Sequence, residues 1–228
     1  MHPQSLPMKA PFHFGHDFVV GDCNRVAYRM IMDWPNWPDP ILYLHGPAQA
    51  GKSHLGFLWQ QKIQHQYQKH IPVYDAWSSH DYDLWCMSGY PPLLWDVSSG
   101  QLPCDERLLY HTINEVRHHG SFLLWIGALT LGSCPVSLND LASRLQGMVS
   151  VTVQKPDDDV LHQLMQQLFL QRGLKISDDV MKYLLHRVPR SYQGLLHVIQ
   201  KLDDYAWDWQ KNLTIPVIKD VFSDDDRV

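Results

Sequence analysis

An eight-residue run most constrains what this chain can fold into: Gly46-Pro47-Ala48-Gln49-Ala50-Gly51-Lys52-Ser53. It fits the phosphate-loop pattern G-x-x-x-x-G-K-[S/T]. The apolar stretch Ile41-Leu42-Tyr43-Leu44 precedes the run, and Leu55-Gly56-Phe57-Leu58-Trp59 with a Gln- and Lys-rich continuation follows it. The first stretch predicts a buried strand and the second a helix. A strand that leads through a glycine loop into a helix directs backbone N–H groups and the positive helix end toward phosphate oxygens.

The run therefore predicts a nucleotide-binding site. Lys52 would reach the β- and γ-phosphates, and the Ser53 hydroxyl would help to hold Mg²⁺. The competing interpretation is an incidental glycine-rich turn, which the flanking strand and helix disfavour.

A second apolar run, Pro91-Pro92-Leu93-Leu94-Trp95-Asp96, ends in a carboxylate about forty residues after the loop. This is the pattern of a strand whose terminal aspartate organises Mg²⁺, so Asp96 is predicted to act with Ser53 on the metal. Val97 follows Asp96, where a second carboxylate would polarise the attacking water. A polar residue is also missing near Ala128-Leu129-Thr130, unless Thr130 substitutes. We therefore expect slow or no intrinsic ATP hydrolysis, with ADP held as a structural ligand.

Composition excludes several classes of protein. The formal charge of −5 argues against a stand-alone nucleic-acid-binding protein, which is usually basic. No apolar run approaches 18 residues, and the N-terminus lacks the charged start and apolar centre of a signal peptide. The four scattered cysteines fit neither a zinc site nor a disulfide framework. We expect a cytoplasmic protein without membrane association.

The remaining pattern alternates strands and helices and then becomes helical. Strands are predicted at 41–44, 72–77, 91–96, 121–127 and 149–153. One helix is predicted before them at 22–32, and others are predicted between them at 105–118 and 140–145. The continuous apolar runs are typical of a parallel sheet. Helices are predicted at 157–172, 177–186 and 191–209. The expected fold is α/β with a parallel five-stranded sheet: an arm over 1–16, a nucleotide-binding domain over 17–155 and a helical lid over 156–228.

Several dispersed motifs resemble the AAA+ domain of the bacterial replication initiator DnaA. Residues 17–27 resemble its opening F-V-x-G-x-x-N-x-x-A, and Gly51-Lys52-Ser53-His54-Leu55 resembles G-K-T-H-L. Residues 108–114 resemble the L-F-x-x-x-N helix, 138–145 the arginine-finger box, 189–195 the sensor II region and 211–219 the closing I-T-I-P-x-x-K stretch. The resemblance covers about residues 12–222 in the same order. The expected fold is therefore an AAA+ phosphate-loop domain with a lid.

The initiator continues into a helix-turn-helix domain for which this sequence shows no counterpart, so we expect no direct sequence-specific DNA binding. The chain thus resembles the Hda family of initiator regulators, in its α-proteobacterial form. That resemblance implies adenine nucleotide, ADP or ATP, as the cofactor with Mg²⁺. The implied partners are DnaA, the DNA polymerase III sliding clamp and a second copy of the chain in a homodimer.

The same resemblance assigns further residues. Arg144 would be an arginine finger that acts in trans on the nucleotide of a neighbouring subunit, where its charge would stabilise the γ-phosphate in the transition state. A helix-surface salt bridge is the alternative role for Arg144. Arg190 would contact the chain's own nucleotide, as would Val19, Val20 and His54. Three residues of the arm would bind the clamp: Gln4, Leu6 and Met8.

The predicted function is regulatory inactivation of DnaA through hydrolysis of its bound ATP. A helicase-loader-type ATPase is the alternative, and it would bind single-stranded DNA and the replicative helicase. The acidic balance and the box around Arg144 favour the regulator. A small-molecule kinase is disfavoured because the helical region follows the fifth strand and no Arg-rich loop lies between strands.

Overall fold

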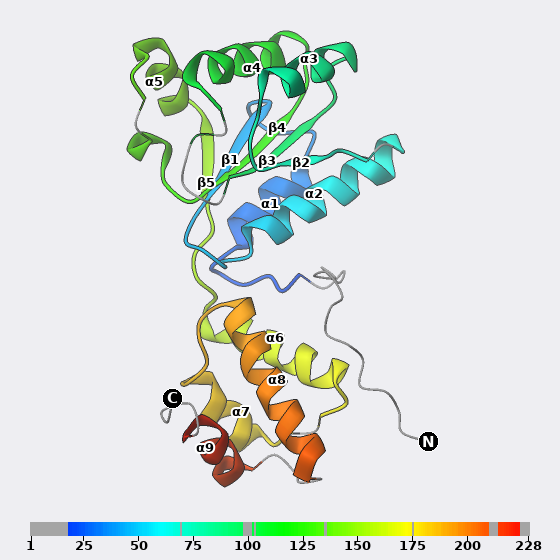
Figure 1. Ribbon diagram of the computed structural model, residues 1–228, viewed down its shortest axis with the longest axis vertical. Helices are drawn as coiled ribbons and strands as arrows, with labels where there is room; N and C mark the ends of the chain where they lie inside the picture. Colours follow the sequence, from blue (N-terminus) through cyan, green and yellow to red (C-terminus); the bar gives the residue numbers. More distant parts are fainter. Residues whose placement is uncertain are drawn as a thin grey trace.

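The computed structural model describes residues 18–68, 70–97, 102, 104–134, 136–174, 176–209 and 214–223. A parallel α/β unit comes first and a helical unit second (Figure 1). In chain order the first unit contains α1 (Arg25–Asp33), β1 (Ile41–His45), α2 (Lys52–Tyr67), β2 (Val73–Tyr74), α3 (Ser79–Met87), β3 (Leu93–Val97), α4 (Glu106–His118), β4 (Leu123–Gly127), the 3-10 helix η1 (Leu131–Ser133), α5 (Asn139–Gln146) and β5 (Val149–Thr152). The second unit contains α6 (Asp158–Gln171), α7 (Asp178–Leu185), α8 (Tyr192–Trp209) and α9 (Ile215–Ser223).

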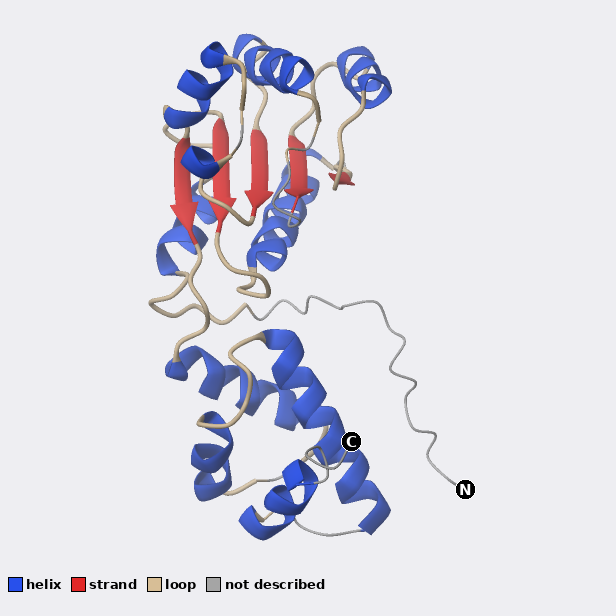
Figure 2. Ribbon diagram, turned by 60° about the vertical axis from the view of Figure 1, so that its left-hand side comes forward, coloured by secondary structure: helices blue, strands red, loops and turns tan. Residues whose placement is uncertain are grey.

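The sheet has five strands in the order β2-β3-β4-β1-β5, and every pairing is parallel. All strand arrows therefore point the same way, toward the helical unit (Figure 2). Ligands of open parallel sheets bind beyond the carboxyl ends of the strands. The fold thus places the loop after β1 at the edge of the sheet that faces the helical unit.

Alternation along the strands separates two apolar cores. On β1, Leu42 and Leu44 belong to the core beneath α1 and α2, whereas Ile41 and Tyr43 belong to the core beneath α3, α4 and α5. Figure 1 shows these two helical layers on opposite faces of the sheet. Because successive side chains of a strand point to opposite faces, strands covered on both sides need apolar residues at every position. This accounts for the continuous apolar runs in the sequence.

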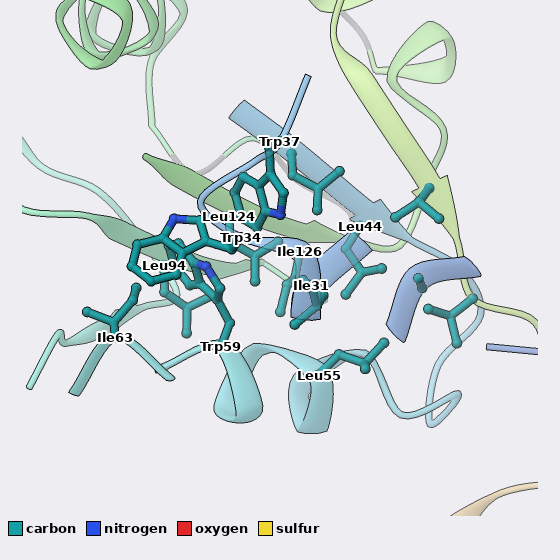
Figure 3. Close-up of a cluster of buried hydrophobic side chains, with 14 of the residues drawn as sticks. Ile31, Trp34, Trp37, Leu44, Leu55, Trp59, Ile63, Leu94, Leu124 and Ile126 are labelled. Atoms are coloured by element: carbon teal, nitrogen blue, oxygen red, sulfur yellow. The ribbon is translucent and has the colours of Figure 1, made fainter. Parts of the chain in front are cut away.

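Tryptophans fill much of the core beneath α1 and α2 (Figure 3). Trp34 and Trp37 lie in the loop between α1 and β1, and both are buried against Trp59 of α2. The Trp37 and Trp59 rings stack with centroids 5.4 Å apart, and Trp34 meets Trp59 edge-on at 6.2 Å. The loop between α1 and β1 thus uses its two tryptophans for packing.

The helical unit has its own core, formed by apolar side chains from α6, α7, α8 and α9. Asp157 caps α6 by accepting from the Val160 backbone N–H at 2.8 Å, and Ser177 caps α7. The five-stranded parallel sheet followed by a helical lid is therefore confirmed as the fold.

Four elements differ from the expected ones, one of them the short 3-10 helix η1. The strand expected at 72–77 is only Val73–Tyr74, at the edge of the sheet. Helix α3 was not expected, and a capping box between Ser78 and Asp81 begins it. Helix α9 was not expected either, although Pro216 in its first turn is compatible with a helix because the first N–H groups have no helical partner.

Candidate nucleotide site

The loop predicted to bind phosphate joins the end of β1 to the start of α2. Gly46 has a φ of 149°, and a Cβ placed there would lie 2.0 Å from the carbonyl oxygen of Val153. The His45 carbonyl accepts a hydrogen bond from the Val153 N–H at 2.8 Å, which holds the segment after β5 against the loop. Only glycine fits here, so the first glycine of the motif is fixed by the sheet as well as by ligand access.

Lys52 lies in the first turn of α2 with its side chain 4% exposed. Its ammonium group donates to the carbonyls of Gly46 at 2.8 Å and Pro47 at 2.7 Å. Burial lowers the pKa of Lys52, and the charge of Asp96 acts in the opposite direction. The ammonium is thus inside the loop, where phosphate oxygens could replace the carbonyls as acceptors.

The structure brings Asp96 to the same place. Strand β3 pairs with β4, which pairs with β1, so the carboxyl ends of β1 and β3 lie on one edge of the sheet. Asp96 alternates with Trp95 and Val97, both of which belong to the core beneath α4. Its carboxylate therefore points to the α2 face, the side on which Lys52 lies, and could hold a metal ion beside bound phosphates.

The remaining loop residues differ in exposure. Pro47, Ala48 and Gln49 are exposed, as is Ser53, whereas Ala50 is buried. Gly51 immediately precedes α2, so the N–H groups of the first turn of this helix adjoin the loop. His54 contacts Phe18 edge-on, with ring centroids 5.1 Å apart. The loop and the helix start therefore form a contiguous surface at the carboxyl edge of the sheet.

No second carboxylate follows Asp96 in the site. Val97 is buried in the opposite core with 3% of its surface exposed. After β4, the Thr130 hydroxyl is 2.8 Å from the Ser133 hydroxyl, and the Leu129 carbonyl accepts from the Tyr43 hydroxyl at 2.6 Å. The hydroxyl of Thr130 is thus engaged with a neighbour in its own turn.

Residues 18–24 connect the loop to the lid. Val19 is buried with Cys23 against Val160 of α6, and Val20 is half-buried beside it. The Asn24 side chain accepts from the Gly21 N–H at 3.0 Å and donates to the Val19 carbonyl at 2.9 Å. The segment expected to contact nucleotide therefore also packs on the lid. The role of Phe18, which stacks on Tyr28 and touches His54, was not predicted.

The lid meets the phosphate loop through a contact that the motifs did not indicate. Gln49 donates from Nε2 to Oε1 of Gln193 on α8 at 2.9 Å, and its φ is 60°. Arg190, the predicted sensor II residue, is paired instead with Asp158 at 2.6 Å. It also donates to the Pro156 carbonyl at 3.4 Å. In this structure the lid therefore reaches the loop through Gln193, while Arg190 lies against the start of α6.

Comparison with known proteins agrees with this geometry. Residues 157–222 match the family described as Hda, lid domain. An uncharacterized protein of Haemophilus influenzae is 23% identical over 199 residues, which cover 81% of this chain and 82% of that protein. Domain III of the Thermotoga maritima replication initiation protein DnaA has the same fold, with a TM-score of 0.70 at 18% identity over 91% of this chain and 94% of that one.

A second solved structure, AMPPCP-bound DnaA from Aquifex aeolicus, gives a TM-score of 0.60 at 17% identity and covers 80% of this chain and 62% of that one. The chain therefore has the fold of the DnaA nucleotide-binding domain, and its helical unit matches the Hda lid. None of the helices that the structure describes is long and apolar enough to span a membrane.

Arg144 lies in the last turn of α5, and only Gly147 and Met148 separate that helix from the start of β5. It therefore lies near the amino edge of the parallel sheet, opposite the carboxyl edge that carries the phosphate loop. Helix α5 lies at the end of the α/β unit that is remote from the lid (Figure 1). The guanidinium lies over the ring of Tyr110 on α4, 4.8 Å from the centroid, and Nη2 donates to the Tyr110 hydroxyl at 3.4 Å. The predicted clamp-binding residues Gln4, Leu6 and Met8 lie outside the described residues.

Proposed function

We propose that this protein binds an adenine nucleotide and inactivates the replication initiator DnaA by promoting hydrolysis of the ATP bound to the initiator. The observation that carries the proposal is the match of residues 157–222 to the Hda lid. The fold shared with domain III of DnaA over 91% of this chain supports it, because subunits of like fold can pack head to tail through heterologous interfaces. In this function the protein limits the initiation of replication in the cytoplasm.

The nucleotide site fits ADP or ATP with Mg²⁺. Lys52 is buried inside the loop and would donate to phosphate oxygens, while Ser53 and Asp96 would hold the metal ion. Bound Mg²⁺ would neutralise phosphate charge. The buried apolar Val97 and the internally bonded Thr130 supply no group that positions water. We therefore expect a bound nucleotide to stay intact and to serve mainly in structure.

Arg144 would act on the partner's nucleotide. Its place near the amino edge of the sheet leaves its own phosphate loop, at the carboxyl edge, out of reach, and the residue is half-exposed. A guanidinium inserted beside the γ-phosphate of a neighbour stabilises charge that develops during hydrolysis, by about 10³- to 10⁵-fold in known cases. Gln4, Leu6 and Met8 would bring the protein to the sliding clamp, and a homodimer would be its form away from DnaA.

The test is hydrolysis of DnaA-bound ATP with and without the sliding clamp loaded on DNA. Wild-type protein is compared with Arg144→Ala and with a matched control, Arg187→Ala. The guanidinium of Arg187 also lies over a tyrosine ring, 3.8 Å from the centroid of Tyr183 in the lid. Arg187→Ala therefore removes a similar cation–π contact at a site away from Arg144.

We expect stimulation that depends on the clamp, that Arg144→Ala abolishes and that Arg187→Ala preserves. Equal loss in both arginine variants would indicate general damage and contradict the role of Arg144. If wild-type protein leaves DnaA-bound ATP intact and instead binds single-stranded DNA and the replicative helicase, the helicase-loader function is correct.

A further inference from the structure

The surroundings of Arg144 suggest how its side chain is held. A free arginine side chain samples many rotamers, so a guanidinium that must enter a neighbour's site benefits from support on its own subunit. The described contacts of Arg144 are both with one residue, Tyr110 of α4: the ring face at 4.8 Å and the hydroxyl at 3.4 Å. Tyr110 is therefore placed to fix both the position and the plane of the guanidinium.

Tyr110 is itself held in place. It packs against the core beneath α3, α4 and α5, and its hydroxyl also interacts with Asn114 one turn later on the same helix. Hydrogen bonds from Arg144 first and Asn114 second lower the pKa of Tyr110. The ring face and the hydroxyl of Tyr110 therefore both contact the same guanidinium.

The position of Arg144 on its helix adds to this support. The residue lies in the last turn of α5, where the negative end of the helix dipole favours a cation. Its neighbour Leu145 is buried in the core, which fixes the end of the helix relative to α4. The backbone under Arg144 is thus anchored, and Tyr110 supplies the remaining constraint on the side chain.

We propose that Tyr110 is a positioning residue for Arg144: its ring holds the guanidinium in the orientation that enters the nucleotide site of DnaA. This inference rests on the proposed function. It implies that Tyr110 changes the rate of hydrolysis on DnaA without contributing to the binding of DnaA, because its contacts are with the reacting guanidinium.

The experiment compares Tyr110→Phe and Tyr110→Leu with wild-type protein. Phenylalanine keeps the ring face, whereas leucine keeps apolar packing and removes the cation–π contact. Cation–π contacts at partly exposed sites correspond to about 3- to 10-fold in a rate. We expect Tyr110→Leu to lower the maximal rate of DnaA ATP hydrolysis by that factor at an unchanged half-saturating concentration, and Tyr110→Phe to retain most of the rate.

Tyr183→Leu is the matched control, because it removes the ring under Arg187 and Tyr183 likewise packs at the edge of an apolar core. Its hydrolysis rate should equal that of the wild type. A second readout does not depend on DnaA. The Nε–Hε NMR signal of Arg144, assigned with Arg144→Ala, should carry a ring-current shift in the wild type and in Tyr110→Phe and lose it in Tyr110→Leu.

The outcomes distinguish a failure of the positioning role of Tyr110 from a failure of the proposed function. If wild-type protein stimulates DnaA and Arg144→Ala does not, but Tyr110→Leu works at the wild-type rate, the positioning role is wrong while the proposed function stands. A faster Tyr110→Leu also overturns the inference, since the ring would then hold Arg144 back. If wild-type protein does not stimulate DnaA, the proposed function fails and the inference fails with it, whatever the NMR signal shows.

Discussion

Replacing Gly46 with alanine tests whether the phosphate loop is locked to the sheet. A Cβ at this position would lie 2.0 Å from the Val153 carbonyl oxygen and 3.1 Å from its carbon. The obstacle is backbone, which cannot rotate away as a side chain can. The φ of 149° is also one that an L-residue rarely adopts. Either the loop must rebuild or the segment after β5 must move away from β1.

Both changes cost free energy. An alanine forced into a glycine-only region costs about 1–3 kcal/mol. Relieving the contact by moving backbone costs about 1–3 kcal/mol more, as in an overpacked core. Loss of the 2.8 Å bond between the Val153 N–H and the His45 carbonyl adds about 1 kcal/mol. The expected loss is therefore about 3–7 kcal/mol, a large part of the ~5–15 kcal/mol that stabilises a typical domain.

Urea unfolding followed by tryptophan fluorescence measures this loss, because most of the tryptophans lie in the α/β unit. Gly132→Ala is the matched control: a Cβ there meets no atom within 4 Å, and its stability should match the wild type within about 0.5 kcal/mol. If Gly46→Ala is as stable as the control and still binds nucleotide, the loop is not locked to β5 and the reasoning is wrong.

Three further results are expected. Lys52→Ala should weaken binding of a fluorescent ADP analogue by about 10- to 150-fold, since a charged hydrogen bond to phosphate is worth ~1.5–3 kcal/mol; an unchanged Kd would exclude Lys52 from the site. Asp158→Asn should release Arg190 from an ion pair whose side chains are half-exposed, with a change in the free energy of unfolding under ~1 kcal/mol. It should strengthen binding of the ADP analogue by up to about 5-fold, whereas Arg190→Ala should weaken that binding. Burial first, and the charge of Lys52 second, lower the pKa of His45 from 6.5, so the unfolded chain takes up this proton at a higher pH than the folded chain. The free energy of unfolding should therefore fall as pH drops below about 6.5, and His45→Gln should reduce that fall in urea titrations across pH.

Strong local patterns made most of the fold predictable. The loop motif, the apolar runs at β1, β3 and β4 and the caps of the lid helices each have a physical cause within a few residues of sequence. The elements that were missed lacked such a pattern. Helix α3 has one buried residue, Trp85, and its apolar side chains do not gather on one face. Its only clear signal was the Ser78–Asp81 capping box.

The site was predictable where one segment determines the chemistry and unpredictable where two segments meet. Lys52 and Asp96 follow from a motif and a strand end, and the parallel sheet then brings them together. The Gln49–Gln193 contact joins residues 144 positions apart, and nothing in either neighbourhood indicates the other. Likewise, the placement of Tyr110 under Arg144 depends on how α4 and α5 pack, which a helical pattern does not specify.

Lys52 and Arg144 lie at opposite edges of the sheet, and this separation makes the proposed roles of the two residues independent of one another. Lys52 begins α2 directly after the loop at the carboxyl end of β1, whereas Arg144 ends α5 just before the amino end of β5. Mutations at distant sites with no shared partner act additively. Lys52→Ala should therefore weaken nucleotide binding and leave the ring-current shift of Arg144 intact. If the ring-current shift disappears in Lys52→Ala, the occupancy of the nucleotide site changes the position of Arg144 through the sheet. Arg144 would then be regulated by a nucleotide that it does not contact.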